Sequence, residues 1–165
     1  MKKTIAILLA AVMVLALAAC AKNDKQPDTG MPNPMREVSA DEMEFNVNVP
    51  KGAEDVKYFI IEDGDSKMDQ VSYTLDGKDY CYRMQQTNEV ASYDMSGIYA
   101  DKWETENTKV SGCDAVVMTS SEGSVIYWLD VVPGINYTLS CSQLLSASEL
   151  SEAAAALFAP MQGEA

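Results

Sequence analysis

The sequence contains no histidine, and its 12 lysine and arginine residues face 25 aspartate and glutamate residues. Without histidine, Ser-His-Asp and Cys-His catalysis and histidine-ligated zinc or haem are excluded. The formal net charge of −13 at pH 7 argues against binding of nucleic acid, because the phosphates require clustered cations. A chain of 165 residues has room for one small globular domain, so a multidomain enzyme is excluded as well.

A long apolar run occurs only near the beginning of the chain. Two lysines precede a continuous apolar stretch from Ile5 to Leu17, and small residues follow, which is the layout of a secretory signal peptide over residues 1–19. The tetrapeptide LAAC at residues 17–20 resembles the lipobox of bacterial lipoproteins. That resemblance implies cleavage before Cys20 and attachment of a diacylglyceryl group to its sulfur. An uncleaved anchor is disfavoured because a membrane span needs about 20 apolar residues.

We therefore expect a protein held by lipid on Cys20 at the extracytoplasmic face of the cell membrane. Cleavage removes two lysines and no acid from a chain of net charge −13, which leaves −15. Residues 20–40 are rich in proline and poor in large aliphatic residues, which predicts a flexible linker after the lipidated cysteine. The folded domain is expected over residues 41–160, with a short tail at 161–165.

Within this domain, alternating hydrophobicity and turn residues predict an antiparallel sheet of about 6–7 strands, built from hairpins and a meander. The expected strands cover residues 43–49, 56–62, 70–75, 78–85, 110–119, 124–132 and 135–142. Asp76-Gly77 predicts a tight hairpin turn. Residues 87–108 form a long connection whose aromatic side chains indicate that it folds back onto the sheet.

A C-terminal amphipathic helix is predicted by its start signal and by its apolar spacing. Ser146 and Glu149 fit a capping box, Leu145 and Leu150 occupy the flanking apolar positions, and Pro160 ends the helix. Apolar residues recur at helical spacing from Leu150 onward, so one face should lie on the sheet. The fold class is therefore α+β, with one helix packed on an antiparallel sheet.

Dispersed aromatic and glycine residues carry a resemblance to a known family. They occur in the segments 94–103, 112–115, 127–128, 134–139 and 148–150. Over residues 43–159, and most strongly from Tyr93 onward, the chain resembles a family of small extracytoplasmic domains of unknown function from Gram-positive anaerobes. Members of that family occur in lipoproteins and on anti-sigma-type membrane proteins. The resemblance implies fold and location but no reaction, and it brings no catalytic residue.

Three cysteines remain beyond Cys20, in a compartment where disulfides persist. Cys113 and Cys141 lie near opposite ends of strands separated by a third, so their Cα atoms should exceed the bridging range of ~7 Å. Cys81 with Cys113 is the expected pair if one forms, and three reduced thiols are an equal alternative. Cys141 continues an apolar strand face, which indicates a core thiol. No CxxC spacing occurs in the sequence, so we expect no metal or cofactor site.

The long connection supplies the candidate partner surface, namely Tyr93, Ile98, Tyr99 and Trp103. No residue is a candidate for catalysis, so we expect a monomeric, non-catalytic binding or sensing module whose partner is an envelope protein or a small ligand. The alternative is a carrier of a lipid or another hydrophobic ligand in a cavity between sheet and helix, because curved sheets closed by a helix enclose such cavities.

Overall fold

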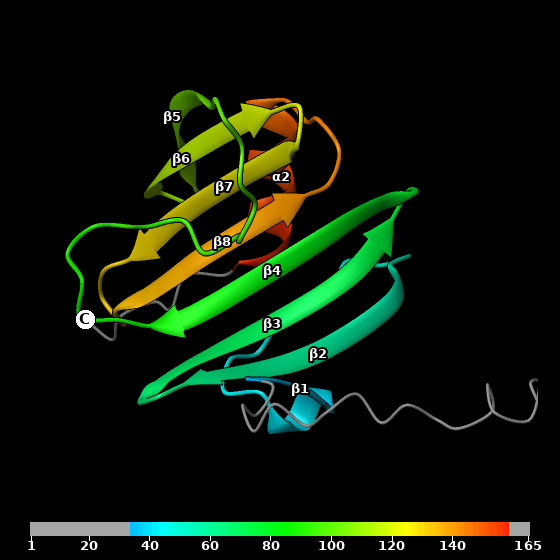
Figure 1. Ribbon diagram of the computed structural model, residues 1–165, viewed down its shortest axis with the longest axis vertical. Helices are drawn as coiled ribbons and strands as arrows, with labels where there is room; N and C mark the ends of the chain where they lie inside the picture. Colours follow the sequence, from blue (N-terminus) through cyan, green and yellow to red (C-terminus); the bar gives the residue numbers. More distant parts are fainter. Residues whose placement is uncertain (1–33, 159–165) are drawn as a thin grey trace, which may run out of the picture. The chain divides into compact units, whose positions relative to one another are not determined.

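The computed structural model describes residues 34–158, so the predicted signal peptide, Cys20 and Pro160 lie outside the described residues. The described elements are β1 (Met35–Val38), the 3-10 helix η1 (Ala40–Glu42), β2 (Glu54–Asp63), β3 (Ser66–Leu75), β4 (Lys78–Gln86), β5 (Glu104–Val110), β6 (Cys113–Ser120), β7 (Gly123–Asp130), β8 (Ile135–Cys141) and α2 (Ala147–Leu157). The strands form one antiparallel sheet with α2 packed against it (Figure 1). The predicted α+β class is confirmed, with an 8-stranded sheet.

The sheet consists of two sets of consecutive hairpins that meet in its middle. The strand order is β1-β2-β3-β4-β8-β7-β6-β5, so β4 pairs with β8 and not with β5. This central ladder runs from Tyr80 opposite Cys141 to Gln86 opposite Ile135. The chain therefore leaves β4 at the centre and must cross the sheet to reach β5 at the far edge (Figure 1).

Tight turns with positive φ connect the two strands within several of these hairpins. Asp76 and Gly77 have φ of 52° and 72°, so the predicted hairpin between β3 and β4 is confirmed. Ser111 and Gly112, with φ of 47° and 95°, form a similar turn between β5 and β6. The prediction of one strand over residues 110–119 is therefore wrong at its start. β5 itself was expected to be part of the connection, because its sequence ETENTKV is almost entirely polar.

Two features near residue 40 differ from the sequence predictions. β1 lies within residues 20–40, which were assigned to the linker, and it pairs with β2 from Met35 opposite Ile61. Residues 43–49 alternate between half-buried and exposed as predicted, but they are not a strand. The N–H groups of Glu44 and Phe45 instead donate to Asp69 Oδ2, at 2.6 and 3.0 Å. This extended segment lies over the core with alternate side chains inward, which reproduces the spacing of a strand without its ladder.

The core fills the space between α2, the extended segment and one face of the sheet, here called the core face. Val71, Ile126 and Leu139 on the sheet and Leu150 and Ala154 on α2 are completely enclosed. Burial of a leucine side chain of this kind stabilises the fold by about 1.5–3 kcal/mol. Aromatic rings pack in the same layer: Tyr82, Trp128 and Tyr137 stack on one another, and Phe158 packs against Trp128 and Tyr137.

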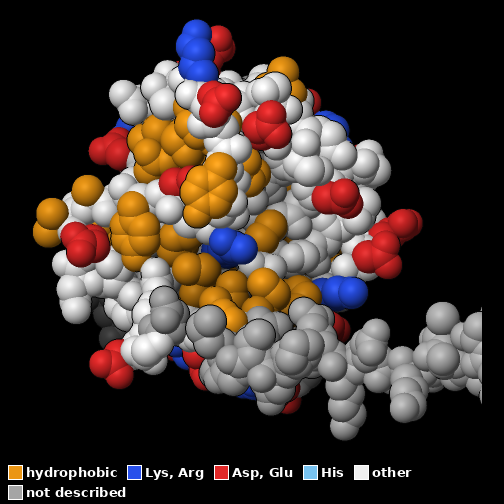
Figure 2. Space-filling model, in the orientation of Figure 1, with side chains coloured by type: hydrophobic (Ala, Val, Ile, Leu, Met, Phe, Trp, Pro, Cys, Tyr) orange, Lys and Arg blue, Asp and Glu red, His pale blue; other side chains and the backbone are white. Residues whose placement is uncertain are grey.

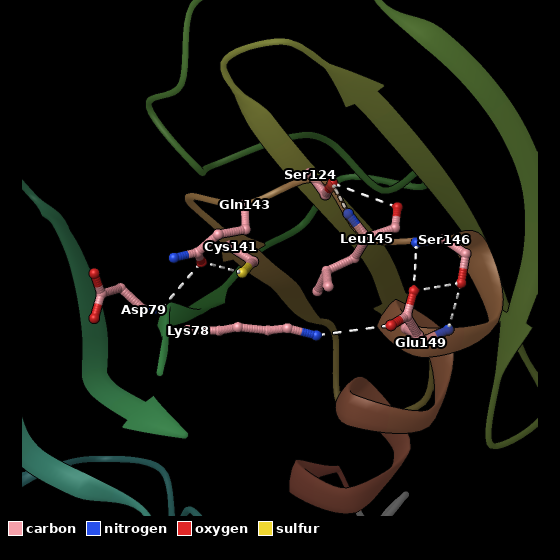
Figure 3. A network of polar contacts seen from close by, with 8 residues as sticks. All are labelled: Lys78, Asp79, Ser124, Cys141, Gln143, Leu145, Ser146 and Glu149. Atoms are coloured by element: carbon pink, nitrogen blue, oxygen red, sulfur yellow. Dashed lines mark hydrogen bonds and ion pairs between the residues drawn. The ribbon is translucent and has the colours of Figure 1, made fainter. Parts of the chain in front are cut away.

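The start of α2 is fixed by polar contacts to the sheet, shown in Figure 3. The hydroxyl of Ser146 accepts the N–H of Glu149 at 3.3 Å, and the Glu149 carboxylate accepts the N–H of Ser146 at 2.9 Å, which confirms the capping box. The hydroxyl of Ser124 on β7 accepts the N–H of Leu145 at 2.8 Å. Lys78 Nζ lies 3.7 Å from Glu149 Oε1. These contacts set the position at which the helix begins over the sheet.

Candidate functional site

The connection between β4 and β5, residues 87–103, crosses the face of the sheet opposite α2, and we call these residues the connecting loop and that face the outer face. In Figure 1 the loop passes in front of β7 and β8. Asn136 on β8 accepts the N–H of Tyr93 at 3.1 Å and donates to its carbonyl at 2.8 Å. Thr138 accepts the N–H of Met95 at 3.1 Å, and Arg83 donates to the carbonyl of Met95. The loop is thus bonded through its own backbone to side chains of the sheet.

These contacts arise because β8 is buried on both faces. Ile135, Tyr137 and Leu139 point into the core, while the side chains between them point to the outer face. Those alternate positions hold Asn136 and Thr138, which are 0% and 1% exposed. Buried polar side chains need partners, and the backbone of the loop supplies them. The alternation of polar and apolar residues along β8 is the sequence signal for these anchors. Asn136 and Thr138 were nevertheless not among the residues predicted from the sequence.

Arg83 on β4 organises the middle of the outer face. Its Nε donates to Gln70 Oε1 at 2.8 Å, and Gln70 Nε2 donates to Ser72 Oγ at 3.2 Å. Gly97 of the loop has a φ of 73°, and a Cβ at this position would lie 3.3 Å from Arg83 Nη1. Glycine is therefore favoured there by its backbone conformation, and its lack of a side chain leaves room for the guanidinium group.

The four side chains predicted for the partner surface do not behave alike. Tyr93 is half-buried, and its hydroxyl donates to Gln85 Oε1 at 2.8 Å. Ile98 is half-buried and lies close to Gly123, where an added Cβ would be 3.4 Å from its Cδ1. Trp103 is half-buried, whereas Tyr99 is 91% exposed. Tyr93 and Ile98 thus attach the loop to the sheet, and Tyr99 projects from it.

Hydrophobic side chains gather on the outer face over the loop and over β2 and β3, with acidic side chains and a few basic ones scattered between and around them (Figure 2). On β2, Phe59 and Ile61 are half-buried and pair with Gln70 and Met68 on β3. Phe59 lies in the same cross-strand row as Arg83, since Gln70 pairs with both. The outer face therefore combines apolar side chains with the partly buried guanidinium group of Arg83, and acidic side chains lie around them.

The three cysteines among residues 34–158, namely Cys81, Cys113 and Cys141, are unbridged. Cys81 on β4 and Cys113 on β6 have β8 and β7 between them, and three strand spacings amount to about 14 Å. The expected pair is therefore out of bridging range, because β8 inserts beside β4 in a way that the sequence reading did not anticipate. Cys141 is 1% exposed in the core, as predicted, and donates to Gln143 Oε1. Burial raises the pKa of all three thiols, which disfavours the reactive thiolates.

The core face also contains a cavity. Its volume is about 340 Å³, and it lies between the extended segment, the sheet and the end of α2. The polar residues at its rim and the aromatic residues inside it come from segments far apart in the sequence. Only the assembled fold brings them together.

Among residues 34–158, no three His, Cys, Asp or Glu side chains come together in a way that would hold a metal ion. In the same residues, no helix is long and apolar enough to cross a membrane. No family model, curated protein or solved structure matches the chain. The family resemblance stays a prediction from the sequence.

Proposed function

We propose that this protein is a lipid-anchored, non-catalytic binding module of the cell envelope, which presents its outer face to an envelope protein. The LAAC segment and the proline-rich residues after it support the anchor and the tether. A net charge of −15 on the mature chain favours a domain that stands away from an anionic lipid surface. Recognition then depends on the folded part alone.

The observation that carries the proposal is the attachment of the connecting loop to the sheet. Long loops without secondary structure are uncommon in compact domains, and they lose conformational entropy when a partner orders them. Here the backbone bonds from Tyr93 and Met95 to Asn136, Thr138 and Arg83 are already present. The loop is therefore ordered before any partner binds, which reduces the cost of binding.

The composition of the outer face suits a protein partner. Tyr99 is 91% exposed, and tyrosine is among the residues that most often dominate binding energy at protein interfaces. The apolar side chains on β2 and the loop would form the centre of such an interface, with charged residues at its rim. Because the surrounding charge is acidic, we expect the partner to be basic at the matching rim.

The anchor and the binding face can be tested separately in the native envelope. The change Cys20→Ser should release the protein from the membrane fraction, because the acyl chains have no other attachment site. For the face, a photo-crosslinking amino acid at position 99 should give one dominant adduct with an envelope protein. The control is the same amino acid at Leu144, a 71% exposed apolar residue beside the start of α2. Identical adducts from both positions, or none from position 99, would reject the outer face as the binding surface.

A second function, the carriage of a small ligand, is favoured by the cavity on the core face. Its volume of about 340 Å³ is at the lower end of the range for small-molecule pockets. A cavity of this size favours a compact ligand over a diacyl lipid. Under the carrier hypothesis we therefore expect a small molecule as the ligand.

A further inference from the structure

Another cavity lies at the end of the sheet where β7 ends and β8 begins (Figure 1), and we call it the end cavity. Its volume is about 510 Å³. It is lined by residues 90–92 of the connecting loop, by residues 112–114 at the turn into β6, and by residues 129–132 from the end of β7 into the following turn. Among residues 34–158, neither lysine nor arginine lines this cavity, whereas Asp114 and Asp130 do.

Asp130 is the buried polar residue of the end cavity. It pairs with Ile135 of β8 at the margin of the core and is 6% exposed. Its Oδ2 atom is enclosed and has no hydrogen-bond partner among residues 34–158. Lys109 does not neutralise it, because Lys109 is ion-paired with Asp114. A buried carboxylate oxygen without a partner is costly, so a hydrogen-bond donor that enters the cavity would be stabilised there.

The negative charge of Asp130 acts on the groups around it. Burial raises the pKa of the Cys113 thiol, and the charges of Asp130 and Asp114 raise it further, with Lys109 opposing them. Burial likewise raises the pKa of Tyr137, and the charge of Asp130 adds to that effect. An anionic ligand would therefore be repelled from the end cavity, whereas a cationic one would be attracted.

Three exposed apolar side chains stand around the same cavity. Val90, Val131 and Val132 are 93%, 74% and 79% exposed, and they make up half of the large hydrophobic residues exposed among residues 34–158. Single exposed hydrophobic residues are ordinary, but several of them together are typical of a binding surface. A small cation would reach Asp130 and leave the valines in water, whereas a polypeptide segment would cover them too. The patch therefore favours a protein as the occupant.

The turn that carries two of these valines, residues 131–134, is held by the end of β4. Gln86 Nε2 donates to the carbonyls of Pro133 and Gly134 at 2.7 and 3.1 Å. The N–H of Thr87 donates to the Gly134 carbonyl as well, at 2.8 Å. The valines are thus presented on a fixed backbone, so a partner that covers them has little of this turn left to order.

We propose that the end cavity takes up a lysine or arginine side chain of an envelope protein, and that Val131 and Val132 contact apolar residues next to it. The cationic group would donate to Asp130 Oδ2, and the methylene groups of its stem would lie against the apolar residues that line the cavity. This proposal rests on the proposed function, because it supplies the chemistry of one contact with the protein partner.

A random heptapeptide library displayed on phage and selected against the purified full chain tests the sequence of this contact. We expect the enriched peptides to share a lysine or arginine with an apolar residue beside it. The best of them, synthesised with norleucine in place of the basic residue, should bind about tenfold more weakly, because a hydrogen bond to a charged group is lost. Enrichment of peptides without a basic residue, or no enrichment, would overturn the proposal.

Variants of equal charge tie the binding to the end cavity. Asp130→Asn should weaken binding of the enriched peptide about tenfold. Asp114→Asn removes the same charge from an exposed, ion-paired side chain, so it should change the affinity less than about threefold. Val132→Ser should weaken binding, whereas Leu144→Ser, at a similarly exposed residue outside the cavity, should not. Equal losses in the two aspartate variants would reduce the effect to net charge and refute the assignment.

Urea unfolding separates a role in binding from a role in the fold. Asp130→Asn replaces an unpartnered buried carboxylate by a neutral side chain of similar size, so its unfolding midpoint should be no lower than that of the wild type. A lower midpoint would assign Asp130 to the fold and overturn its role in binding. Failed peptide selection with unchanged crosslinks from position 99 would refute the end cavity alone. Lost crosslinks with intact peptide binding would refute the outer face alone.

Discussion

Removal of the Asn136 side chain tests whether the connecting loop is held by the sheet. In Asn136→Ala, the N–H and carbonyl of Tyr93 lose partners at 3.1 and 2.8 Å. Each such hydrogen bond contributes about 1 kcal/mol, and a buried group left without a partner costs about 1–3 kcal/mol. Because Asn136 is 0% exposed, water cannot replace it without a local opening. We expect the free energy of unfolding to fall by about 2–4 kcal/mol.

Two measurements check this prediction. With a denaturant slope of about 1–3 kcal/mol per molar urea, the unfolding midpoint should fall by about 1–2 M. Hydrogen exchange at the amides of Tyr93 and Met95 should accelerate more than exchange at the core-facing positions of β8, because the loop is released before the sheet opens. Asn107→Ala on β5 is the control, since Asn107 is exposed, and its effect should stay within about 0.5 kcal/mol. An unchanged midpoint with protected amides at Tyr93 and Met95 would refute the reasoning.

Three further predictions concern the helix cap, the buried tyrosine and the thiols. Ser146→Ala removes the cap of α2 and should lower the free energy of unfolding by about 1 kcal/mol, measured by urea denaturation; an equal loss in the exposed Ser121→Ala would contradict this. Burial raises the pKa of Tyr137 to about 12, whereas the unfolded chain titrates near 10. The folded state therefore binds this proton more tightly, so the contribution of Tyr137 to stability should be complete below about pH 10 and be lost towards pH 12. Tyr137→Phe should reduce the fall in stability at high pH without abolishing it, because burial also raises the pKa of Tyr82. Under non-reducing conditions an alkylating reagent should label all three thiols of the unfolded mature domain and label Cys141 slowest in the folded one, and a mass two hydrogens lower would indicate a disulfide instead.

Local signals in the sequence predicted the elements that local chemistry determines. The hairpin at Asp76-Gly77 depends on two residues that tolerate positive φ, and the start of α2 depends on Ser146 and Glu149. Both are satisfied within a few residues of chain, so the prediction needed no knowledge of distant segments. The class of the fold followed from the same kind of information.

Features that depend on distant partners were not predictable in this way. β5 is polar because it is an edge strand with only Val110 fully buried, so it carries no hydrophobic period. The segment 43–49 shows the period of a strand although Asp69 takes the place of a neighbouring ladder. Tyr93 and Tyr99 of the candidate surface are equally aromatic in sequence, but Tyr93 is half-buried and Tyr99 is exposed. Tyr93 is held by Asn136 through its backbone and by Gln85 through its hydroxyl, and both partners lie on strands outside the loop.

The ladder between β4 and β8 also has a consequence for how the chain folds. Every other pair in the sheet is a hairpin of consecutive strands, whereas this one closes a loop that contains the whole of β5, β6 and β7. Since the entropy cost of closure rises with loop length, the local hairpins form first and this ladder forms last. Because β5, β6 and β7 separate β4 from β8 in the chain, β4 is left as an open edge until the final strand pairs with it. That interval is the stage at which pairing of two chains through β4 competes with correct folding.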